Sequence, residues 1–228
     1  MTAIAPTSLD HVALWVADRD AIADLVCDHL GMHVIERTER FTLVGADARE
    51  GKLTLFTAEG PRERGALSAI VLRVPSLEDA LAALPPEVRV AREEGTAWLD
   101  APEGLRLGLV GGAPAGTDLD HVRLKVSDVE AMAAALAELG FEPDGERLRV
   151  RDRWVVLEAG GEPEGDRPLL NHLAMLVDSA TEVAEEARRR GAEVADVVDA
   201  PNTLAVFLWG PDRVKLEFVE HKPGFSLV

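Results

Sequence analysis

The run Leu9-Asp10-His11-Val12-Ala13-Leu14 returns almost unchanged as Leu119-Asp120-His121-Val122-Arg123-Leu124. Two related runs are Leu67-Ser68-Ala69-Ile70-Val71-Leu72 and Leu170-Asn171-His172-Leu173-Ala174-Met175. The third positions of the four runs are numbered 11, 69, 121 and 172, so they lie 58, 52 and 51 residues apart. A period near fifty residues indicates one structural unit repeated four times, and each apolar run predicts a strand that opens its unit.

Each opening run is followed by the pattern of an amphipathic helix, such as the apolar residues spaced between Ile22 and Leu30. Three of these helices are expected to close at a left-handed glycine, and the second is expected to stop at Pro85-Pro86. The three glycines are Gly31, Gly140 and Gly191. Alternating segments such as residues 204–209 then complete each unit, which is predicted to be β-α-β-β-β.

The stretch from Gly111 to Thr117 is rich in glycine, alanine and proline, which favours a linker over a regular element. It separates the second unit from the third. We therefore expect two domains of two units each, over residues 1–112 and 117–228.

Two pairs of β-α-β-β-β units resemble the extradiol dioxygenases of the vicinal oxygen chelate superfamily, which also includes glyoxalase I and bleomycin-binding proteins. The resemblance rests on the Leu-Asp/Asn-His openings and on the closing segment Gly210-Pro211-Asp212-Arg213-Val214-Lys215-Leu216-Glu217-Phe218-Val219. It implies an α+β fold in which four βαβββ modules pair into two domains. Each domain would be a curved mixed β-sheet with its helices on the convex face.

The composition is that of an ordinary globular protein, with 47% hydrophobic and 29% charged residues. The formal net charge of −17 disfavours binding to nucleic acid and to anionic membranes. No apolar run is long enough to span a bilayer, and residues 1–8 lack the pattern of a secretion signal. We therefore expect a cytoplasmic monomer or homodimer that acts on a small molecule.

The resemblance implies that His121, His172 and Glu217 bind a divalent metal ion in the second domain. Strand alternation supports the last of them, because Glu217 falls on the opposite face from Leu216 and Phe218, which are expected to pack beneath helices. Two imidazoles and one carboxylate suit Fe(II) or Mn(II), and Zn(II) is the main competitor. A surface glutamate and two structural histidines are the alternative interpretation.

The first domain is expected to repeat this geometry without the chemistry. Ala69 stands where His172 does, and Gly108 stands where Glu217 does. His11 would then be alone, and a single histidine holds a metal poorly. We therefore interpret His11 as a structural or vestigial residue.

The usual acid–base groups of the extradiol enzymes are missing, because the chain has no tyrosine and no histidine at 122–171 or 173–220. His221 is a candidate general base, although it could also be a surface residue of the tail. Glu158 is a candidate fourth ligand or base, with a surface charge at a strand end as the alternative.

Three further residues are candidates for substrate binding. Arg123 follows His121 by two positions, so it should share its face and could bind an oxyanion. Phe207 and Trp209 alternate on one face and could form an aromatic wall for a flat substrate, although a place in the core is as compatible with the pattern.

The leading hypothesis is a metal-dependent enzyme resembling extradiol dioxygenases, which binds a small oxygenated and possibly anionic compound by bidentate chelation. A glyoxalase- or epimerase-type lyase or isomerase is the second hypothesis. It would need Glu158 near the metal. A non-enzymatic drug-binding protein of the bleomycin-sequestering type is the third, and it would bind no metal.

Overall fold

The fold consists of four consecutive β-α-β-β-β units, seen in a computed structural model that describes residues 4–228. Unit 1 comprises β1 (Ser8–Val16), α1 (Arg19–Asp24), β2 (His33–Arg37), β3 (Phe41–Gly45) and β4 (Lys52–Thr57). Unit 2 comprises β5 (Leu67–Val74), α2 (Leu77–Ala83), β6 (Val90–Glu93), β7 (Thr96–Asp100) and β8 (Arg106–Gly111). Unit 3 comprises β9 (Asp118–Val126), α3 (Val129–Glu138), β10 (Glu142–Asp144), β11 (Arg147–Val150) and β12 (Arg153–Ala159). Unit 4 comprises β13 (Leu170–Leu176), α4 (Ala180–Arg189), β14 (Val194–Asp199), β15 (Thr203–Trp209) and β16 (Lys215–His221).

Short polar side chains begin each of the four α-helices. Each unit has an aspartate or serine whose side-chain oxygen accepts a hydrogen bond from a backbone N–H of the first turn, which satisfies a group the helix leaves unpaired. These N-caps are Asp18, Ser76, Asp128 and Ser179. Helix α1 continues as a π-helical turn, Leu25–His29, before it reaches Gly31. The glycines expected to close three helices do have positive φ, at 76° for Gly31, 92° for Gly140 and 74° for Gly191, which confirms that part of the prediction.

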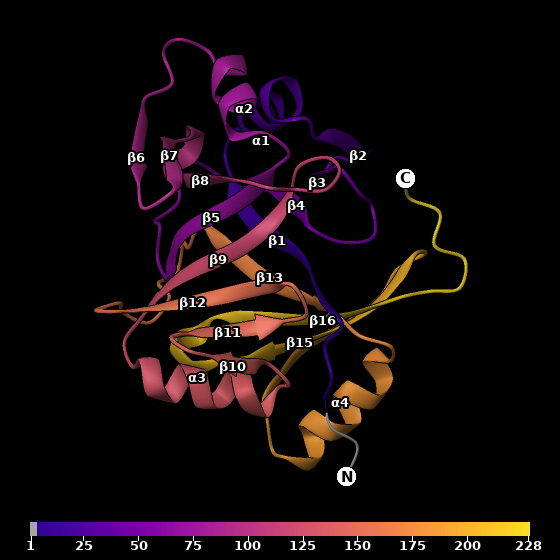
Figure 1. The fold of residues 1–228 in the computed structure, drawn as a ribbon. Helices are drawn as coiled ribbons and strands as arrows, with labels where there is room; N and C mark the ends of the chain where they lie inside the picture. Colours follow the sequence, from indigo (N-terminus) through magenta and orange to yellow (C-terminus); the bar gives the residue numbers. More distant parts are fainter. Residues whose placement is uncertain (1–3) are drawn as a thin grey trace.

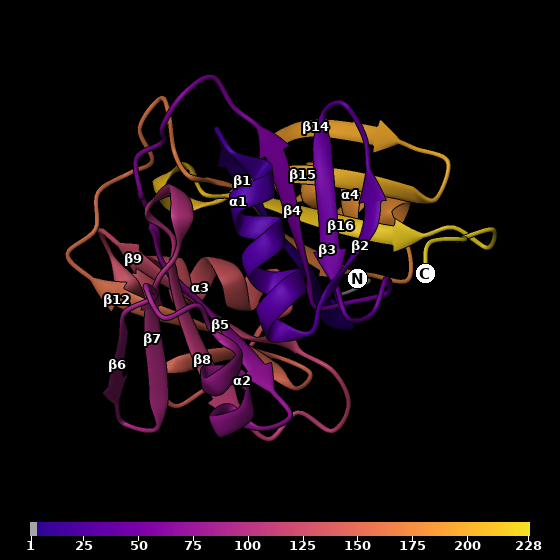
Figure 2. The same ribbon diagram turned by 90° about the horizontal axis from the view of Figure 1, so that it is seen from above.

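The units pair into two eight-stranded mixed sheets, and Figure 2 shows their strands in separate halves of the molecule. Units 1 and 4 form one sheet, in the order β14-β15-β16-β13-β1-β4-β3-β2, which we call sheet 1/4. Units 2 and 3 form the other, in the order β10-β11-β12-β9-β5-β8-β7-β6, which we call sheet 2/3. Antiparallel pairs, β1 with β13 and β5 with β9, join the units at the centre of each sheet. The expected fold class is confirmed.

The pairing of units differs from the order along the chain. Each sheet takes one unit from each half, so the division into residues 1–112 and 117–228 does not coincide with the two sheets. The linker between these halves joins β8 to β9 within sheet 2/3. The sequence did not reveal which units share a sheet, because the four opening strands are so alike that their patterns do not specify their partner strands.

Two other linkers carry the chain between the sheets. Residues 58–66 join unit 1 to unit 2, residues 160–169 join unit 3 to unit 4, and the two segments run side by side. Glu63 donates its backbone N–H to Arg167 O at 2.9 Å, and Leu169 donates to Glu63 O at 2.6 Å. The two linkers between the sheets are therefore held together by backbone hydrogen bonds.

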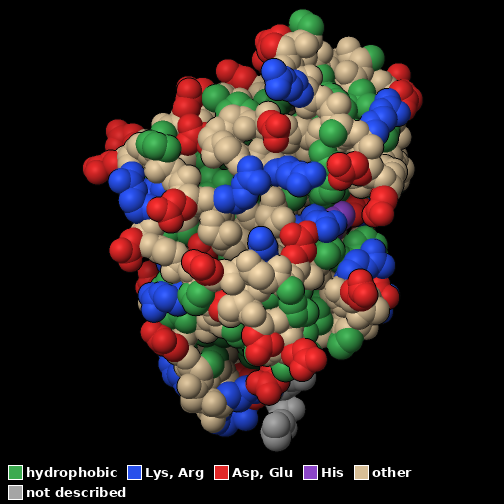
Figure 3. All heavy atoms as spheres, turned by 90° about the vertical axis from the view of Figure 1, so that its left-hand side faces the viewer, with side chains coloured by type: hydrophobic (Ala, Val, Ile, Leu, Met, Phe, Trp, Pro, Cys, Tyr) green, Lys and Arg blue, Asp and Glu red, His purple; other side chains and the backbone are tan. Residues whose placement is uncertain are grey.

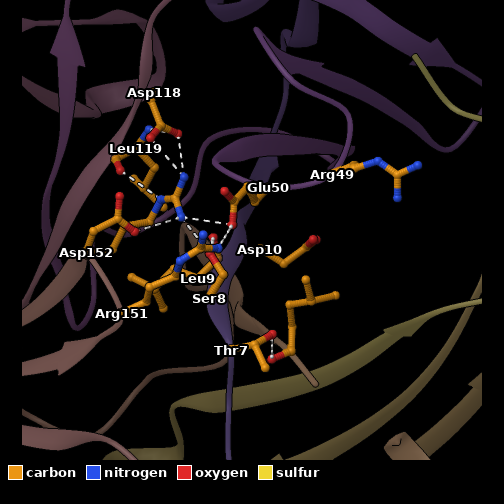
Figure 4. A network of polar contacts seen from close by, with 12 residues as sticks. Thr7, Ser8, Leu9, Asp10, Arg49, Glu50, Asp118, Leu119, Arg151 and Asp152 are labelled. Atoms are coloured by element: carbon orange, nitrogen blue, oxygen red, sulfur yellow. Dashed lines mark hydrogen bonds and ion pairs between the residues drawn. The ribbon is translucent and has the colours of Figure 1, made fainter. Parts of the chain in front are cut away.

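A buried arginine in β12 connects the two sheets at a second place, shown in Figure 4. Arg153 is 2% exposed, and its guanidinium contacts both carboxylate oxygens of Asp118 in β9 at 2.9 and 2.8 Å. It also reaches unit 1, where it lies 2.5 Å from Ser8 Oγ and 3.1 Å from Glu50 Oε2. A buried charge needs such partners to offset its desolvation, so this network fixes β12 against β1.

Strand alternation separates two faces of sheet 1/4. In β1, Val12, Leu14 and Val16 are fully buried in the hydrophobic core. His11 and Trp15 lie on the opposite face, where the residues are partly accessible. The candidate ligands His172 and Glu217 come from strands β13 and β16 of the same sheet.

Charge is spread over the surface in both signs. On the face drawn in Figure 3, Lys and Arg side chains form a band across the middle, with Asp and Glu side chains on both sides of it. Within residues 4–228, no helix is long and apolar enough to cross a membrane.

Candidate metal centre

Three side chains that could bind a metal meet on the accessible face of sheet 1/4. His11 Nε2 lies 3.0 Å from His172 Nε2, and Glu217 Oε2 lies 3.2 Å from the first nitrogen and 2.7 Å from the second. All three side chains are largely buried, at 12%, 5% and 8% exposure. The three potential ligand atoms lie within 4.8 Å of one another, which is close enough for all of them to bind one ion.

The strand register explains why these residues converge. His11 on β1 faces Ala174 on β13, and His172 faces Ala13, so the two histidines are placed diagonally about the centre of the sheet. Glu217 on β16 pairs with Ala174 in turn. The two alanines leave room between the imidazoles. By the same symmetry, Thr54 on β4, which pairs with Ala13, takes the position that matches Glu217.

Both histidines are oriented through their other ring nitrogen. His11 Nδ1 lies 2.7 Å from Asp10 Oδ2, and His172 Nδ1 lies 3.0 Å from Asn171 Oδ1. An oxygen at this position accepts from Nδ1–H, which leaves the Nε2 lone pair free to bind a metal. Histidine ligands in metalloproteins are usually held in this way.

Asp10 is itself part of a buried ionic cluster. Its Oδ1 lies 2.9 Å from Lys52 Nζ and 3.1 Å from His221 Nε2. Burial alone would raise the pKa of Asp10, but Lys52 and the hydrogen bonds from His11 and His221 lower it far below its usual range. The carboxylate is therefore ionised whenever the protein is folded at neutral pH, and it holds His11 in place.

The three candidate ligands have opposed pKa shifts. Burial lowers the pKa of His11, but the charges of Glu217 and Asp10 outweigh it and raise that pKa to about 9. Burial raises the pKa of Glu217, but His172 and His11 lower it to about 2. For His172, burial prevails and lowers the pKa. One carboxylate thus attracts positive charge to a point between two imidazoles.

The chemistry of the donor set fits a divalent cation. Glu217 Oε2 is buried and makes no hydrogen bond of acceptable geometry within residues 4–228, although it lies close to both imidazole nitrogens. An unpaired buried oxygen is costly unless a cation or donor satisfies it. Two imidazoles and one carboxylate on one side of an ion are typical of sites for Fe(II) and related metals.

The three residues of the expected ligand set do not all lie together. His172 and Glu217 come together, but His121 lies on β9 in sheet 2/3, where its Nδ1 is 2.7 Å from Asp120 Oδ1. His11, which we interpreted as vestigial, occupies the place expected for His121. The reason is the pairing of unit 1 with unit 4.

Two other expected site residues also belong to sheet 2/3. Arg123 Nη2 and Glu158 Oε1 form an ion pair at 2.6 Å, and Ser68 Oγ donates to Glu158 at 2.7 Å. Burial raises the pKa of Glu158, but Ser68 and Arg123 lower it below its usual range. Glu158 is therefore a structural partner of Arg123, and neither residue reaches the His11–His172–Glu217 cluster.

The remaining expected residues lie at or beside the cluster. The ring of Phe207 is 5.2 Å from that of His172 in an edge-on contact. His221 contacts Asp10 and stacks on Phe225 at 4.2 Å, so its ring supports the ligand shell from outside. The C-terminal tail is thus folded back against this edge of the sheet.

A cavity of about 350 Å³ lies further along these strands, and none of the three clustered side chains is among its lining residues. Its lining includes Asn171 and Lys215, which lie one and two residues from the candidate ligands His172 and Glu217. Trp209, predicted as an aromatic wall, lines the cavity, and so does Trp15, which the sequence analysis did not single out. The two-residue steps from His11 to Trp15 along β1 could have identified it.

Comparisons with known proteins agree with this architecture. Residues 8–96 match the family model of the Glyoxalase/Bleomycin resistance protein/Dioxygenase superfamily. A comparison with curated protein sequences finds no match. The structure is similar to that of a "putative dioxygenase from Bacillus subtilis subsp. subtilis str. 168", with a TM-score of 0.79 and 18% identity over 98% of this chain and 88% of that chain.

Two more solved structures share the fold. Glyoxalase I from Zea mays is similar with a TM-score of 0.71 and 17% identity, over 93% of this chain and 92% of that chain. The cppA protein from Streptococcus pneumoniae TIGR4 is similar with a TM-score of 0.66 and 14% identity, over 96% of this chain and 100% of that chain. The family match over residues 8–96 and the paired βαβββ units agree with the vicinal oxygen chelate fold, which these solved structures share.

Proposed function

We propose that the chain is a metal-dependent enzyme, resembling the extradiol dioxygenases, that binds a small oxygenated substrate through two of its oxygens at a divalent ion. His11, His172 and Glu217 would hold the ion. The convergence of these three side chains on one point, with both imidazoles oriented through Nδ1, is the observation that carries the proposal.

The fourth position of the site distinguishes between chemistries. Thr54 occupies the place that would complete a four-residue shell, and its hydroxyl is a weak ligand compared with a carboxylate. Three protein ligands on one side leave several positions of the ion open, which suits simultaneous binding of a chelating substrate and dioxygen. The absence of a carboxylate at residue 54 favours the dioxygenase-like interpretation over the glyoxalase-type one.

When bound, a divalent ion supplies Lewis acidity, which stabilises negative charge that develops on substrate oxygens. The chain's own residues prepare the site. Asp10 and Asn171 hold the two imidazoles with Nε2 directed inward. Phe207 and Phe56, whose rings lie 5.2 and 6.2 Å from His172, keep water away from one side of it. We favour Fe(II) or Mn(II), with Zn(II) as the competitor.

The test begins with the metal content of protein purified without chelator, followed by oxygen uptake with a small panel of catechols after anaerobic loading with Fe(II). We expect about one equivalent of metal in the wild type and none in Glu217→Gln, whose amide keeps the shape of the side chain but is a poorer ligand. Glu220→Gln is the matched control on the same strand, because Glu220 accepts from Ala180 N at 3.0 Å and lies outside the cluster.

Each result assigns the protein to one class. Metal binding with oxygen uptake supports the proposal, whereas metal binding with glyoxalase- or isomerase-type activity and no oxygen uptake supports the second hypothesis. A wild type that binds no metal, or a Glu217→Gln variant with unchanged metal content, contradicts the proposal. The drug-sequestering hypothesis would then replace it.

A further inference from the structure

The turn that leads into β16 has a strained backbone and contributes Arg213 to the lining of the cavity. Asp212 and Arg213 both have positive φ, at 53° and 60°. The corresponding turn before β8 has the same conformation, with φ of 62° at Glu103 and 73° at Gly104. The acidic residue is similar in both turns, but glycine adopts the second conformation freely and arginine does not.

The acidic positions of the two turns have a structural explanation. Glu103 accepts a hydrogen bond from Ala17 N at 2.8 Å, and Asp212 accepts from Ser127 N at 2.7 Å. Each carboxylate thus ties its turn to a neighbouring unit. Within residues 4–228 the Arg213 side chain makes no comparable tie to another unit, and its guanidinium lies against Trp209 instead.

The guanidinium of Arg213 lies 4.8 Å from the ring centre of Trp209, and Lys215 Nζ lies at the same distance of 4.8 Å. Both residues line the cavity. Within residues 4–228, neither forms an ion pair with a carboxylate within 4.0 Å, in a chain with 41 acidic and 24 basic residues. Two cations without carboxylate partners thus meet at one indole.

The tryptophans of sheet 2/3 provide a comparison. Arg106 and Arg123 lie over Trp98, and Arg147 lies over Trp154. Each of these arginines has a carboxylate partner, at 3.9, 2.6 and 3.3 Å respectively. Stacking on tryptophan is therefore common in this protein, whereas stacking without a counter-ion distinguishes the cavity of sheet 1/4.

We propose that Arg213 and Lys215 bind the carboxylate of a planar substrate whose ring lies against Trp209. This inference rests on the proposed function, because it specifies the chemical class of that enzyme's substrate. Lys215 precedes Glu217 by two residues on the same strand face, so the carboxylate would lie about 6 to 7 Å from the metal-binding level. A guanidinium stacked on an indole presents its N–H groups in a fixed plane, which suits a carboxylate.

Two acidic residues also line the cavity and bear on its charge. Burial raises the pKa of Glu164 to about 7, assisted by nearby Asp212 and opposed by a backbone hydrogen bond from Ala66, so this carboxyl is partly protonated at neutral pH. Asp166 is exposed to solvent, where its charge is screened. The two cations therefore dominate the wall formed by Trp209.

The test measures binding of 2-naphthoate and its neutral analogue 2-naphthamide by calorimetry to the wild type and to Arg213→Gly. Glycine already holds this conformation at Gly104, so the turn should fold as before. We expect naphthoate binding to weaken about tenfold or more, as expected for loss of a charged hydrogen bond, while naphthamide changes by less than about twofold.

Arg151→Gly is the matched control. Arg151 is also an arginine with positive φ, at 59°, but it is exposed and pairs with Glu50 at 3.6 Å, away from the cavity. This control should bind both probes like the wild type. Unchanged naphthoate binding by Arg213→Gly, an equal loss for both probes, or a wild type that binds neither probe would overturn the proposal.

A metal-free variant separates this proposal from the metal site. Glu217→Gln should lose metal but still prefer naphthoate to naphthamide, because the carboxylate contacts Arg213 and Lys215. If that preference remains in a wild type that binds no metal, the proposed function fails while the anion site stands. If metal binds normally but Arg213→Gly keeps the preference, only the anion site fails.

Discussion

The two sheets have the same architecture but differ at four matching positions. In sheet 1/4 these positions are held by His11, Thr54, His172 and Glu217. In sheet 2/3 they are held by Ala69, Gly108, His121 and Val156. One sheet therefore has three candidate ligands, and the other has a single histidine.

The space between these positions differs as well. Ala13 and Ala174 lie between the ligands of sheet 1/4, whereas Val71 and Arg123 occupy the corresponding places in sheet 2/3. A Cβ atom added to Gly108 would lie only 2.9 Å from the ring of Trp98 and 2.9 Å from Val71, so the second site is filled by side chains. A metal site needs space as well as ligands. Sheet 1/4 leaves this space open, whereas side chains fill it in sheet 2/3.

The largest effect should come from replacing His11, in contrast to the aligned residue His121. His11→Ala removes one of three ligands and should abolish copurification of the metal, with affinity lower by more than about a hundredfold. His121→Ala should leave the metal content unchanged, because its imidazole lies in the other sheet. Metal analysis of both variants would reverse our assignment if His121→Ala proved the defective one.

Breaking the network that joins the sheets should have the next largest effect. Arg153→Met leaves Asp118 and Glu50 without their buried cation and should lower the free energy of unfolding by about 3 to 5 kcal/mol. Arg151→Met, at an exposed neighbour, should change it by less than about 0.5 kcal/mol. Chemical denaturation measures both, and equal stabilities would show that the network does not hold the sheets together.

Metal affinity should depend on pH in a direction set by the ligand pKa values. The pKa of His11 is raised to about 9, so below this pH a metal ion must displace a proton from the site. Apparent affinity should therefore increase with pH up to about 9 and fall roughly tenfold per unit below it. Competition titrations with a chelator between pH 6 and about 9 test this, and a flat profile would contradict it.

The smallest effect is expected in sheet 2/3. Glu158→Gln weakens an ion pair with Arg123 that is partly open to solvent, so stability should fall by no more than about 1 kcal/mol. Metal content and oxygen uptake should stay as in the wild type. A loss of either would return Glu158 to the site, where the sequence alone had placed it as a candidate ligand or base.

Much of the fold could be predicted because its signals are local. The repeat near fifty residues, the alternation of apolar residues and the closing glycines each depend on neighbours along the chain. Strand alternation also placed Glu217 on the accessible face without reference to any other unit. His172 could likewise be placed from the sequence, because it is the third residue of its opening run, as His11 and His121 are of theirs.

A weaker signal for the pairing was present but not recognised. Each histidine that reaches the cluster is followed two residues later by alanine, as in His11 with Ala13 and His172 with Ala174. His121 is followed at that position by Arg123, whose long side chain fills the face. The small residue marks the sheet with an open centre, although this could be understood only once the strands were paired.

The four units, the face on which each strand presents its side chains and the height of a possible ligand along its strand all follow from local sequence patterns. The position of β1 beside β13, which brings together His11 Nε2 and His172 Nε2 across 161 residues of sequence, is seen only in the folded chain. Side-chain alternation is a property of one strand, whereas strand pairing depends on packing between distant segments. With four nearly equivalent opening strands, packing selected one pairing, and that pairing selected the histidine that joins the site.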